Sequence, residues 1–488
     1  MEFKNIGGVR DMDNPIILQT FYWEMNTGQY AEDFPEEKDL WNLLAARAEE
    51  ISEAGFNFLW FPPANKGAAG IHDVGYGTYD LWDLGEFEQK GSVRTKYGTK
   101  EELENAIEKL HNFDLRILYD AVLNHRLGAD EKEKVLLKDN KEAEVWTKFL
   151  FPGRGEKYSS IKLNWQMFDG VDWDDRTQRA GEFLFQTKEW DNAYDEDYLM
   201  GADLDYANKM IREDVKDWGE WIVNEIDFDG FRFDASKHVD NGFLHDFIEK
   251  VNNSTEKDLF FIGEAWVNDA EHLINYLEVV DQQKLHVFDF PLRVSFVDMM
   301  RGELDMRWLG EKGLINQENY RHRAVTFVEN HDTERDGVNE YGTEAILQRK
   351  LQAYCYILMR RDGVPTVFWK DYYVHGLKEK IDKLIQLRKQ YAYGDAYESE
   401  ENDELTYSYI RTGDEEHPGS GLVMMITQHE NGDVIEKNIN TGKANTSYYD
   451  YTGNIEDSVK TDEDGNGLFK VKGTAEEGYS VWIQGDNK

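Results

Sequence analysis

The sequence predicts an α/β fold, a (β/α)8 TIM barrel with a domain inserted after its third strand and an antiparallel β domain at its carboxyl end. Three observations lead to this prediction. Short apolar runs recur along most of the chain, stretches with helical periodicity separate them, and the alternation is interrupted at two places. Near-continuous apolar runs are typical of strands buried on both faces of a parallel sheet, and alternating strands and helices indicate βα units.

Eight apolar runs are the candidates for the barrel strands. They lie at 16–23, 56–63, 115–123, 228–234, 259–264, 286–291, 324–329 and 365–369. Helical periodicity is visible between several of them, for example at 99–113 and 208–226. Eight strands that alternate with helices are the number that closes a barrel of this type.

Two interruptions divide the chain into domains. The third and fourth runs are separated by about a hundred residues, many more than one connecting helix needs. We therefore expect a barrel made of residues 1–125 and 206–395, with an inserted domain at 126–205. After residue 395, short alternating stretches separated by Gly, Asn and Asp predict a small antiparallel β domain at 396–488.

The charge balance limits the partners that this chain can have. Among its 488 residues, 97 are acidic and 55 are basic, which gives a net charge of −42. Such a surface repels phosphate backbones and anionic lipids, so we expect no nucleic acid, no membrane and a neutral substrate. The charge has two interpretations, an ordinary solvated surface or an adaptation to high salt. We expect a monomer.

Cellular location is predicted from what the chain lacks. The single cysteine, Cys355, excludes an intrachain disulfide framework and a cysteine-based zinc site. The first residues, MEFKNIGGVRDMDNP, contain no apolar segment of the kind that secretion signals carry. These observations predict a cytoplasmic protein, although a mature secreted chain would have the same features.

One motif imitates a calcium-binding loop. TDEDGNG at 461–467 begins like an EF-hand, but the twelfth position is Gly473, where a bidentate Glu is required. We interpret this segment as a hairpin turn. The chain also lacks the GxxxxGK[ST], HExxH and GxSxG motifs, which excludes the simplest nucleotide-binding, zinc-protease and serine-hydrolase functions.

Ionisable residues gather where the predicted strands end, which is where barrel enzymes carry their chemistry. They are Asp120, Asn124 and His125 after the third strand, Arg232, Asp234, Lys237 and His238 on and after the fourth, Glu264 after the fifth, and His331 and Asp332 after the seventh. A single Asp at a strand end is more often a cap. Several acids confined together push their pKa values apart, so that one is protonated beside an ionised one. Cleavage of a glycosidic bond requires this pair.

These strand ends resemble the α-amylase family, glycoside hydrolase family 13. The resemblance lies in four segments that occur in the family's order: DAVLNH at 120–125, GFRFDASKH at 230–238, GEAW at 263–266 and FVENHD at 327–332. LMGADLDY at 199–206 resembles a further region near the end of the inserted domain. The similarity spans nearly the whole chain and is greatest to bacterial liquefying and cytoplasmic α-amylases.

The resemblance implies a role for each matching residue. Asp234 would be the nucleophile that forms a glycosyl-enzyme ester, Glu264 the general acid/base, and Asp332 the third carboxylate, which binds sugar hydroxyls. The implied substrate-binding residues are Arg232 beside Asp234, His125 and His331 as hydrogen-bonding groups, Tyr76 stacked beneath the sugar, Lys237 and His238 on the leaving-group side, and Trp23 as an aromatic wall. For Trp23, ordinary packing at the barrel rim is an equally good interpretation.

The resemblance also implies a structural Ca²⁺ between the barrel and the inserted domain. Its ligands would be Asn124, Asp197, Asp203 and the backbone carbonyl of His238. Asp169, Asp191 and Asp205 resemble the ligands of a further cluster that holds a second Ca²⁺ and a Na⁺. Ala207 stands where liquefying relatives usually carry another Asp, so exposed loop aspartates without a metal are the alternative for this second cluster.

The predicted function is therefore retaining endo-hydrolysis of α-1,4-glucosidic bonds in starch, glycogen or maltooligosaccharides. A related α-glucosidase or transglycosylase would carry the same triad, and a non-catalytic glucan-binding protein is the alternative from another class. Ala235 and the Lys237–His238 pair favour the α-1,4 hydrolase pattern. The intact set of acids argues against a pure binding protein, because binding alone needs no general acid.

Overall fold

Eight parallel strands close into a barrel at the centre of the computed structural model, which describes residues 12, 14–191, 193–194, 196–281, 283–335 and 344–485. The barrel strands are β1 (Ile17–Gln19), β2 (Phe58–Trp60), β5 (Arg116–Ala121), β12 (Gly230–Phe233), β13 (Phe260–Gly263), β14 (Leu285–Phe288), β15 (Ala324–Phe327) and β16 (Val364–Phe368). Each overlaps one predicted apolar run, and all but the first residue of β5 are buried. The predicted barrel is confirmed. Residues 1–11, which belong to the segment examined for a secretion signal, lie outside the described chain.

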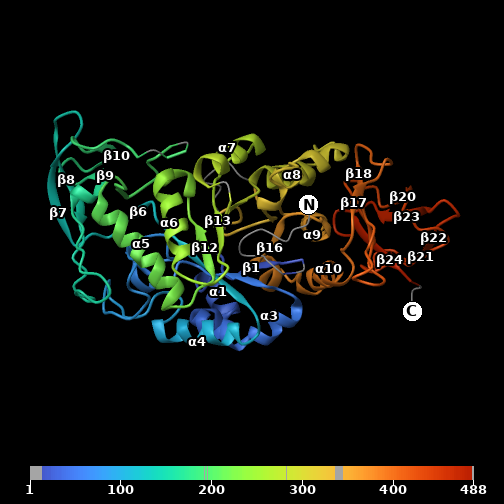
Figure 1. The fold of residues 1–488 in the computed structure, drawn as a ribbon, viewed down its shortest axis with the longest axis horizontal. Helices are drawn as coiled ribbons and strands as arrows, with labels where there is room; N and C mark the ends of the chain where they lie inside the picture. The colour runs from blue at the N-terminus through green and yellow to red at the C-terminus, as the bar shows by residue number, and fades with distance from the viewer. Residues whose placement is uncertain are drawn as a thin grey trace.

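Helices cover the outside of the barrel (Figure 1). They are α1 (Gly28–Asp33), α2 (Leu40–Ala46), α3 (Ala48–Ala54), α4 (Lys100–His111), α5 (Lys209–Asn224), α6 (Asn241–Asn253), α7 (Ala270–Val280), α8 (Phe290–Arg301), α9 (Lys350–Met359) and α10 (Lys378–Gln390). The two stretches singled out for their periodicity correspond to α4 and α5. Thr99 begins α4 with a capping box, in which its side chain accepts from the Glu102 N–H and the Glu102 carboxylate accepts from the Thr99 N–H.

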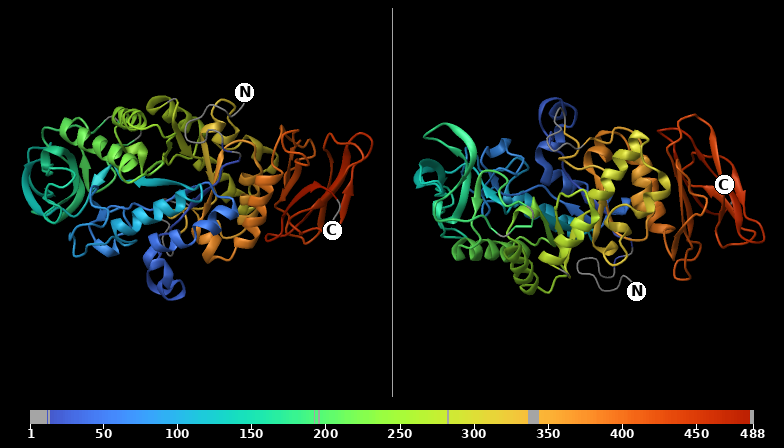
Figure 2. Two further views of the ribbon diagram at one scale, coloured as in Figure 1. Left: turned by 60° about the horizontal axis from the view of Figure 1, so that its bottom comes forward. Right: turned by 90° about the horizontal axis from the view of Figure 1, so that it is seen from above.

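The chain between β5 and α5 forms small sheets of its own at one end of the molecule (Figures 1 and 2). Its strands are β6 (His125–Arg126), β7 (Glu131–Leu136), β8 (Glu142–Lys148), β9 (Phe168–Asp174), β10 (Arg179–Leu184) and β11 (Ala202–Leu204). Strands β10, β9, β11 and β6 make one antiparallel sheet, and β7 pairs with β8. This arrangement agrees with an inserted domain, although its limits at 126 and 205 remain a prediction.

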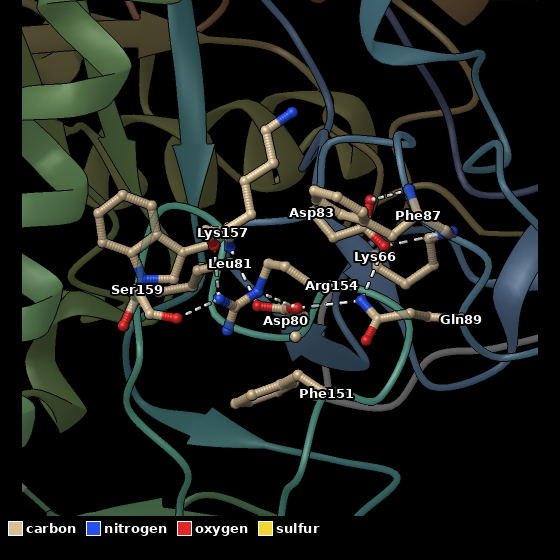
Figure 3. Close-up of polar contacts among 12 residues, drawn as sticks. Lys66, Asp80, Leu81, Asp83, Phe87, Gln89, Phe151, Arg154, Lys157 and Ser159 are labelled. Atoms are coloured by element: carbon tan, nitrogen blue, oxygen red, sulfur yellow. Dashed lines mark hydrogen bonds and ion pairs between the residues drawn. The ribbon is translucent and has the colours of Figure 1, made fainter.

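A buried ion pair connects this inserted segment to the loop that follows β2 (Figure 3). In that loop, β3 (Lys66–Gly67) pairs with β4 (Thr78–Asp80). Arg154 Nε lies 2.7 Å from Asp80 Oδ2, and both side chains are only 1% exposed. Gln89 Nε2 donates to Asp80 and to Asp83. Breaking one partner of such a buried pair costs about 3–5 kcal/mol, so these contacts make the two segments one unit.

The carboxyl-terminal strands lie at the opposite end of the molecule (Figure 2). They are β17 (Ala396–Glu398), β18 (Thr406–Arg411), β19 (Leu422–Thr427), β20 (Val434–Asn440), β21 (Ser447–Asp450), β22 (Ser458–Lys460), β23 (Asn466–Lys472) and β24 (Tyr479–Gln484). Six form a sheet in the order β17-β18-β19-β24-β21-β22, and β20 pairs with β23. Every residue of α9, which contacts β19, is buried between this sheet and the barrel. The predicted antiparallel domain is confirmed as an architecture.

The segment that imitates an EF-hand is a turn, but the interpretation as a hairpin is wrong. It joins β22 to β23, and these strands pair with β21 and β20 rather than with each other. Asp462 Oδ1 accepts from the backbone N–H groups of Asp464 and Asn466. The carboxylate that begins the motif therefore stabilises the turn itself, which an Asp does without any metal.

Candidate active site

The register of the barrel strands brings the predicted nucleophile and acid together. Strands β12 and β13 pair in parallel up to their last residues, so Asp234 and Glu264, which follow them, lie next to each other. On its other side, β12 pairs with β5, which places Arg232 opposite Asp120. Because side chains alternate along a strand, Arg232 points to the same side as Asp234.

Arg232 is the cation at the centre of this group, and its side chain is completely buried. Its Nη1 lies 2.9 Å from Asp234 Oδ1 and 2.6 Å from Asp120 Oδ1, and its Nη2 lies 2.7 Å from Glu264 Oε2. One guanidinium therefore contacts carboxylates from three neighbouring strands. A planar fork with several donors is suited to this, whereas a lysine ammonium would be a single point charge.

Asp120 is a member of the group to which the sequence analysis assigns no role. Its Oδ2 accepts hydrogen bonds from Trp60 Nε1 at 2.9 Å and from the Tyr76 hydroxyl at 2.8 Å. Asp120 therefore connects Arg232 to the ring of Tyr76. The sequence shows an acid on the third strand, but only the strand register reveals that it faces Arg232.

Glu264 is held by one of its two oxygens. Oε2 accepts from the backbone N–H of Ala235 at 3.0 Å and also faces Arg232. Ala235 has a φ of 43°, in the left-handed region that residues with a Cβ seldom adopt, so the turn after Asp234 is strained. Oε1 of Glu264 is buried and has no hydrogen-bond partner within the described chain.

The group holds more negative charge than positive charge. Burial raises the pKa of Asp234 well above its ordinary value, with Arg232 opposing the rise and Glu264 adding to it. Burial, followed by repulsion from Glu264, raises the pKa of Asp332 to about 7. Asp120, Asp234 and Glu264 contact the Arg232 guanidinium, and Arg232 and Arg335 both oppose the rise in the pKa of Asp332. Burial and mutual repulsion nevertheless hold the pKa values of Asp234 and Asp332 above their ordinary values.

The two histidines of the site are neutral. Burial lowers the pKa of His125 to about 4 and that of His331 far below its ordinary value. Gln19 Nε2 can only donate, so His331 Nδ1, 3.0 Å away, accepts and Nε2 carries the proton. His331 Nε2 lies 3.1 Å from Asp332 Oδ2. His125 Nε2 lies 3.0 Å from the Tyr76 carbonyl.

Flat rings surround these polar groups. The ring of Tyr76 is parallel to that of His331, with centroids 4.9 Å apart, and the ring of Trp23 is parallel to both. The guanidinium carbon of Arg335 lies 3.5 Å from the centre of the Trp23 ring. Trp23 thus lies beside the other site residues, and Arg335, which the sequence analysis does not name, covers one of its faces.

Lys237 and His238 lie in the one-turn helix η4 (Ser236–His238) that follows Asp234 and Ala235. The Lys237 carbonyl accepts from the Tyr194 N–H at 3.2 Å, which connects this turn to the inserted segment. His238 is buried and Lys237 is half-buried. Their roles on the leaving-group side remain predictions.

A second group of acids lies between the barrel and the inserted segment. Ligand atoms of Asp169, Asp197 and Asp203 lie within 4.8 Å of one another, and so do those of Asp169, Asp191 and Asp205. Asp169, which we expected only in the second cluster, therefore belongs to both groups. Burial, followed by repulsion from Asp191, raises the pKa of Asp169 to about 9.

The donor atoms of this group fit a hard cation. Asn124 Oδ1 and Asp169 Oδ2 are buried and accept no hydrogen bond within the described chain. Buried oxygens without a partner are rare in proteins unless an ion or water satisfies them. Carboxylate and amide oxygens are the ligands that Ca²⁺ prefers. The residues predicted to hold calcium thus form a set that could hold it.

One part of the second cluster already has a cation. The Lys188 ammonium contacts the Asp205 carboxylate, whose other oxygen accepts from the N–H groups of Ala207 and Asn208. The sequence analysis does not name Lys188. Ala207, which stands where liquefying relatives usually carry an Asp, therefore donates its backbone N–H to Asp205.

A groove of about 420 Å³ opens on the inserted segment beside the strands that carry His125 and Asp203. Its lining consists of Arg126, Leu127, Gly128, Ala129, Trp146, Val171, Asp172, Trp173, Gly201 and Ala202. Trp146 is 42% exposed, an unusual state for so large an apolar ring. The sequence analysis predicts sugar stacking only at Trp23 and Tyr76 and does not identify this groove.

Comparisons with known proteins agree with this geometry. The sequence profile of the family described as "Alpha amylase, catalytic domain" matches residues 46–373, and that described as "Alpha-amylase C-terminal" matches 422–483. An α-amylase of Geobacillus stearothermophilus is 38% identical, and the alignment covers 96% of this chain and 87% of that protein. The cytoplasmic α-amylase of Escherichia coli K12 is 35% identical, with 97% and 99% covered.

Solved structures share the fold. The crystal structure of the α-amylase from Geobacillus thermoleovorans, complexed with acarbose, superposes with a TM-score of 0.66. The alignment covers 97% of this chain and 99% of that one, at 18% sequence identity. In the described part of the present chain, no helix combines the length and the apolar character needed to cross a membrane.

Proposed function

The chain belongs to the α-amylase family, glycoside hydrolase family 13, and from this premise we propose that it hydrolyses internal α-1,4-glucosidic bonds with retention of the anomeric configuration. The proposed substrates are starch, glycogen and maltooligosaccharides, which are neutral and therefore compatible with a net charge of −42. The supporting observation is that Asp234 and Glu264 contact neighbouring nitrogens of the same buried guanidinium.

This shared contact supports retention over inversion. A retaining enzyme needs its two carboxyl groups about 5–5.5 Å apart, whereas an inverting enzyme separates them by about 6.5–9.5 Å to admit water. Two carboxylates that contact adjacent nitrogens of one guanidinium lie close to each other. On this ground we propose direct attack by Asp234 rather than attack by water.

In the first step, Glu264 donates its proton to the glycosidic oxygen while Asp234 attacks the anomeric carbon. The C–O bond to the leaving sugar breaks and an ester to Asp234 forms. Oε1 of Glu264, which accepts no hydrogen bond within the described chain, is the oxygen that we assign to the proton. Arg232 favours the ionised form of Asp234 through Nη1.

In the second step, Glu264 takes a proton from water, and the resulting nucleophile breaks the ester. The sugar leaves with its original configuration, because two inversions restore it. Asp332 faces the sugar hydroxyls as an acceptor and the neutral His331 as a donor through Nε2. His125 donates its one N–H to the Tyr76 carbonyl, so toward the sugar it can only accept, through Nδ1. Neutral imidazoles are suited to this, since a charged ring would have to lose its solvation in the closed site.

We propose that Asn124, Asp169, Asp197 and Asp203 hold Ca²⁺, with the carbonyl of His238 as a further ligand. The ion would neutralise the acidic group and fasten the inserted segment to the barrel, which is a structural contribution rather than a step of the reaction. We further propose a monomer in the cytoplasm. The Escherichia coli relative, which is named a cytoplasmic α-amylase, supports the location.

The test is a reducing-sugar assay on soluble starch with Asp234→Asn and Glu264→Gln. We expect each variant to lose at least about 10³-fold in kcat while its circular dichroism stays that of the parent. Asp457→Asn, at an exposed acid in the carboxyl-terminal sheet region, serves as the matched control and should keep full activity. Substantial hydrolysis by both site variants would refute the assignment, and a product profile would separate hydrolysis from glucosyl transfer.

A further inference from the structure

A buried network of ion pairs lies beneath the segment that carries Asp332. The Lys350 ammonium on α9 contacts the carboxylates of Glu334 and Asp371. His375 bridges the same two acids, with Nε2 3.2 Å from Glu334 Oε1 and Nδ1 3.1 Å from Asp371 Oδ1. The Tyr354 hydroxyl donates to Asp371 Oδ2 at 2.7 Å. Apart from His375, these side chains are almost completely buried.

A second lysine extends this network to another loop of the barrel. Lys370 Nζ lies 3.1 Å from Glu24 Oε2 and 3.9 Å from Glu334 Oε1. The Lys370 side chain is 1% exposed and lies against the rings of Tyr22 and Tyr30. Glu24 is 346 positions away from Lys370 in the chain. One ammonium group therefore connects the segment that follows β1 with the segment that follows β15.

Each of these two segments carries a residue that we assign to the substrate site, Trp23 in the first and Asp332 in the second. Glu24 directly follows Trp23, and Glu334 lies two positions after Asp332. Hydrogen bonds hold the turn that contains Asp332, because Asn330 Oδ1 accepts from the N–H groups of Asp332 and Thr333. On the far side of Glu334, Arg335 stacks on Trp23. The position of Glu334 thus determines where Asp332 and Arg335 lie relative to Trp23.

The network does not need a metal to hold it together. Glu334, Asp371 and His375 offer ligand atoms within 4.8 Å of one another, as a metal site would. The Lys350 ammonium contacts both acids, however, and lies 3.4 Å from His375 Nδ1. The chain itself supplies the cation, so this group differs from the aspartate group between barrel and inserted segment.

We infer that Glu334 and Lys370 are positioning residues for the active site, because the buried pairs that they form hold the loops carrying Asp332 and Trp23 in a fixed relation. This inference rests on the proposed function, since it assigns Asp332 and Trp23 to the substrate site. The geometry of the catalytic step then depends on Glu334 and Lys370 as well. Neither of these two residues touches the sugar. Loss of the Glu334 carboxylate or of the Lys370 ammonium therefore releases the loop that carries Asp332 and the loop that carries Trp23 together.

The test compares Glu334→Gln, Lys370→Met and the double variant with the parent. A displacement of about 1 Å at a catalytic group lowers turnover by about 10²-fold, so we expect kcat to fall by about 10- to 100-fold in each single variant, with KM changed less than about threefold. Because both residues act through one network, the double variant should lose little more than the worse single variant. Lys370→Arg, which keeps the charge, should restore most of the activity.

Asp281→Asn is the matched control. Asp281 is equally buried and faces Arg323, but it precedes β14 and so lies at the end of the barrel opposite to Asp332. This variant should melt at a lower temperature and keep the parent kcat. If Glu334→Gln and Lys370→Met behaved in the same way, with kcat within about twofold of the parent, the two residues would be merely structural and the inference would be overturned.

Hydrogen exchange separates this inference from the proposed function. In Glu334→Gln and Lys370→Met, the amides of Asp332 and Thr333 should exchange at least about tenfold faster, and in Asp281→Asn they should not. This measurement needs no enzymatic activity. Unchanged exchange in the two variants would overturn the positioning role even if the parent is an active enzyme. Faster exchange in the variants, together with a parent that does not cleave glucan, would support the positioning role and refute only the proposed function.

Discussion

The acids around Arg232 and the aspartate group beside them both place carboxylates in a buried site, but the two groups differ in the source of the cation that balances them. Both gather buried carboxylates, and in both burial raises the pKa of at least one acid. At the barrel mouth the chain supplies the cation, Arg232, on the strand that also leads to Asp234. In the aspartate group, the nearby cation of the described chain is Lys188, which contacts Asp205 and only lowers the pKa of Asp169 from a distance, through its charge.

The difference teaches what each group is for. A covalently attached cation keeps fixed distances to the acids that we propose as catalytic, so the charges around them are preorganised. An external cation can join two segments that fold separately, because it binds only when both are in place.

Removing the internal cation should damage both activity and stability. In Arg232→Gln, three buried carboxylates lose their partner, and loss of one member of a buried pair typically costs about 3–5 kcal/mol. We expect starch hydrolysis to fall by at least about 10³-fold and urea unfolding to shift to lower concentration. Arg232→Lys should recover part of the stability and little of the activity, because an ammonium cannot contact three acids in a plane. Full activity in the lysine variant would contradict the role assigned to the fork.

Removing the external cation should affect stability alone. An ion present at 1,000 times its dissociation constant adds about 4 kcal/mol to folding, so chelation should lower the melting temperature by several degrees. Asp203→Asn should melt like the chelated parent and respond weakly to added Ca²⁺. A melting temperature that chelation leaves unchanged would argue against structural calcium.

Asp332 should make the native state less stable as the pH rises. Its pKa is about 7 in the folded protein, mainly because of burial, and about 3.9 in an unfolded chain. The native state therefore binds the additional proton between these values, and stability falls as the pH rises from about 4 to 7. Asp332→Asn should not show this loss, so its advantage over the parent should grow by about 2–3 kcal/mol between pH 5 and pH 8. Urea titrations at pH 5 and pH 8 measure the difference in unfolding free energy between the variant and the parent. A difference that shrinks as the pH rises would contradict the prediction.

Lys188 offers a smaller test within the aspartate group. Its contact with Asp205 suggests that the chain itself provides the second cation there. In Lys188→Met we expect the unfolding free energy to drop by about 1 kcal/mol in chelator and to recover on addition of Ca²⁺. The melting temperature with and without Ca²⁺ checks this. An equal drop in both conditions would show that Lys188 does not stand in for a metal.

The overall charge should give the smallest effect. If the net charge of −42 is an adaptation to salt, screening should relieve repulsion and raise the melting temperature between low salt and about 1 M NaCl. The calcium-loaded parent is the sample to use, so that salt does not act through the metal. A melting temperature that stays constant would contradict the adaptation to salt and leave an ordinary solvated surface as the interpretation of the net charge.

The sequence predicts the parts of the site that depend on local pattern. The apolar runs locate all eight barrel strands, and the acids at their ends include Asp234, Glu264 and Asp332. Strand ends meet at one face of a barrel, so their convergence follows from the fold class.

The parts that the sequence does not predict depend on pairing between distant segments. Arg232 contacts Asp120 across 112 positions, and Lys370 contacts Glu24 across 346. No periodicity connects such residues, because their contact depends on strand register and loop path. Arg335 and Lys188 were missed for the same reason, since a charged residue in a loop is usually solvated.

Attack by Asp234 on the sugar, with Glu264 as the proton donor to the same bond, determines which anomer is released first. Proton NMR of the sugar released from a maltooligosaccharide in the first minutes, before mutarotation, identifies that anomer. We expect the α-anomer as the first product, which then equilibrates. The β-anomer appearing first would mean that water attacks directly, and the arrangement of acids around Arg232 would then need a different explanation.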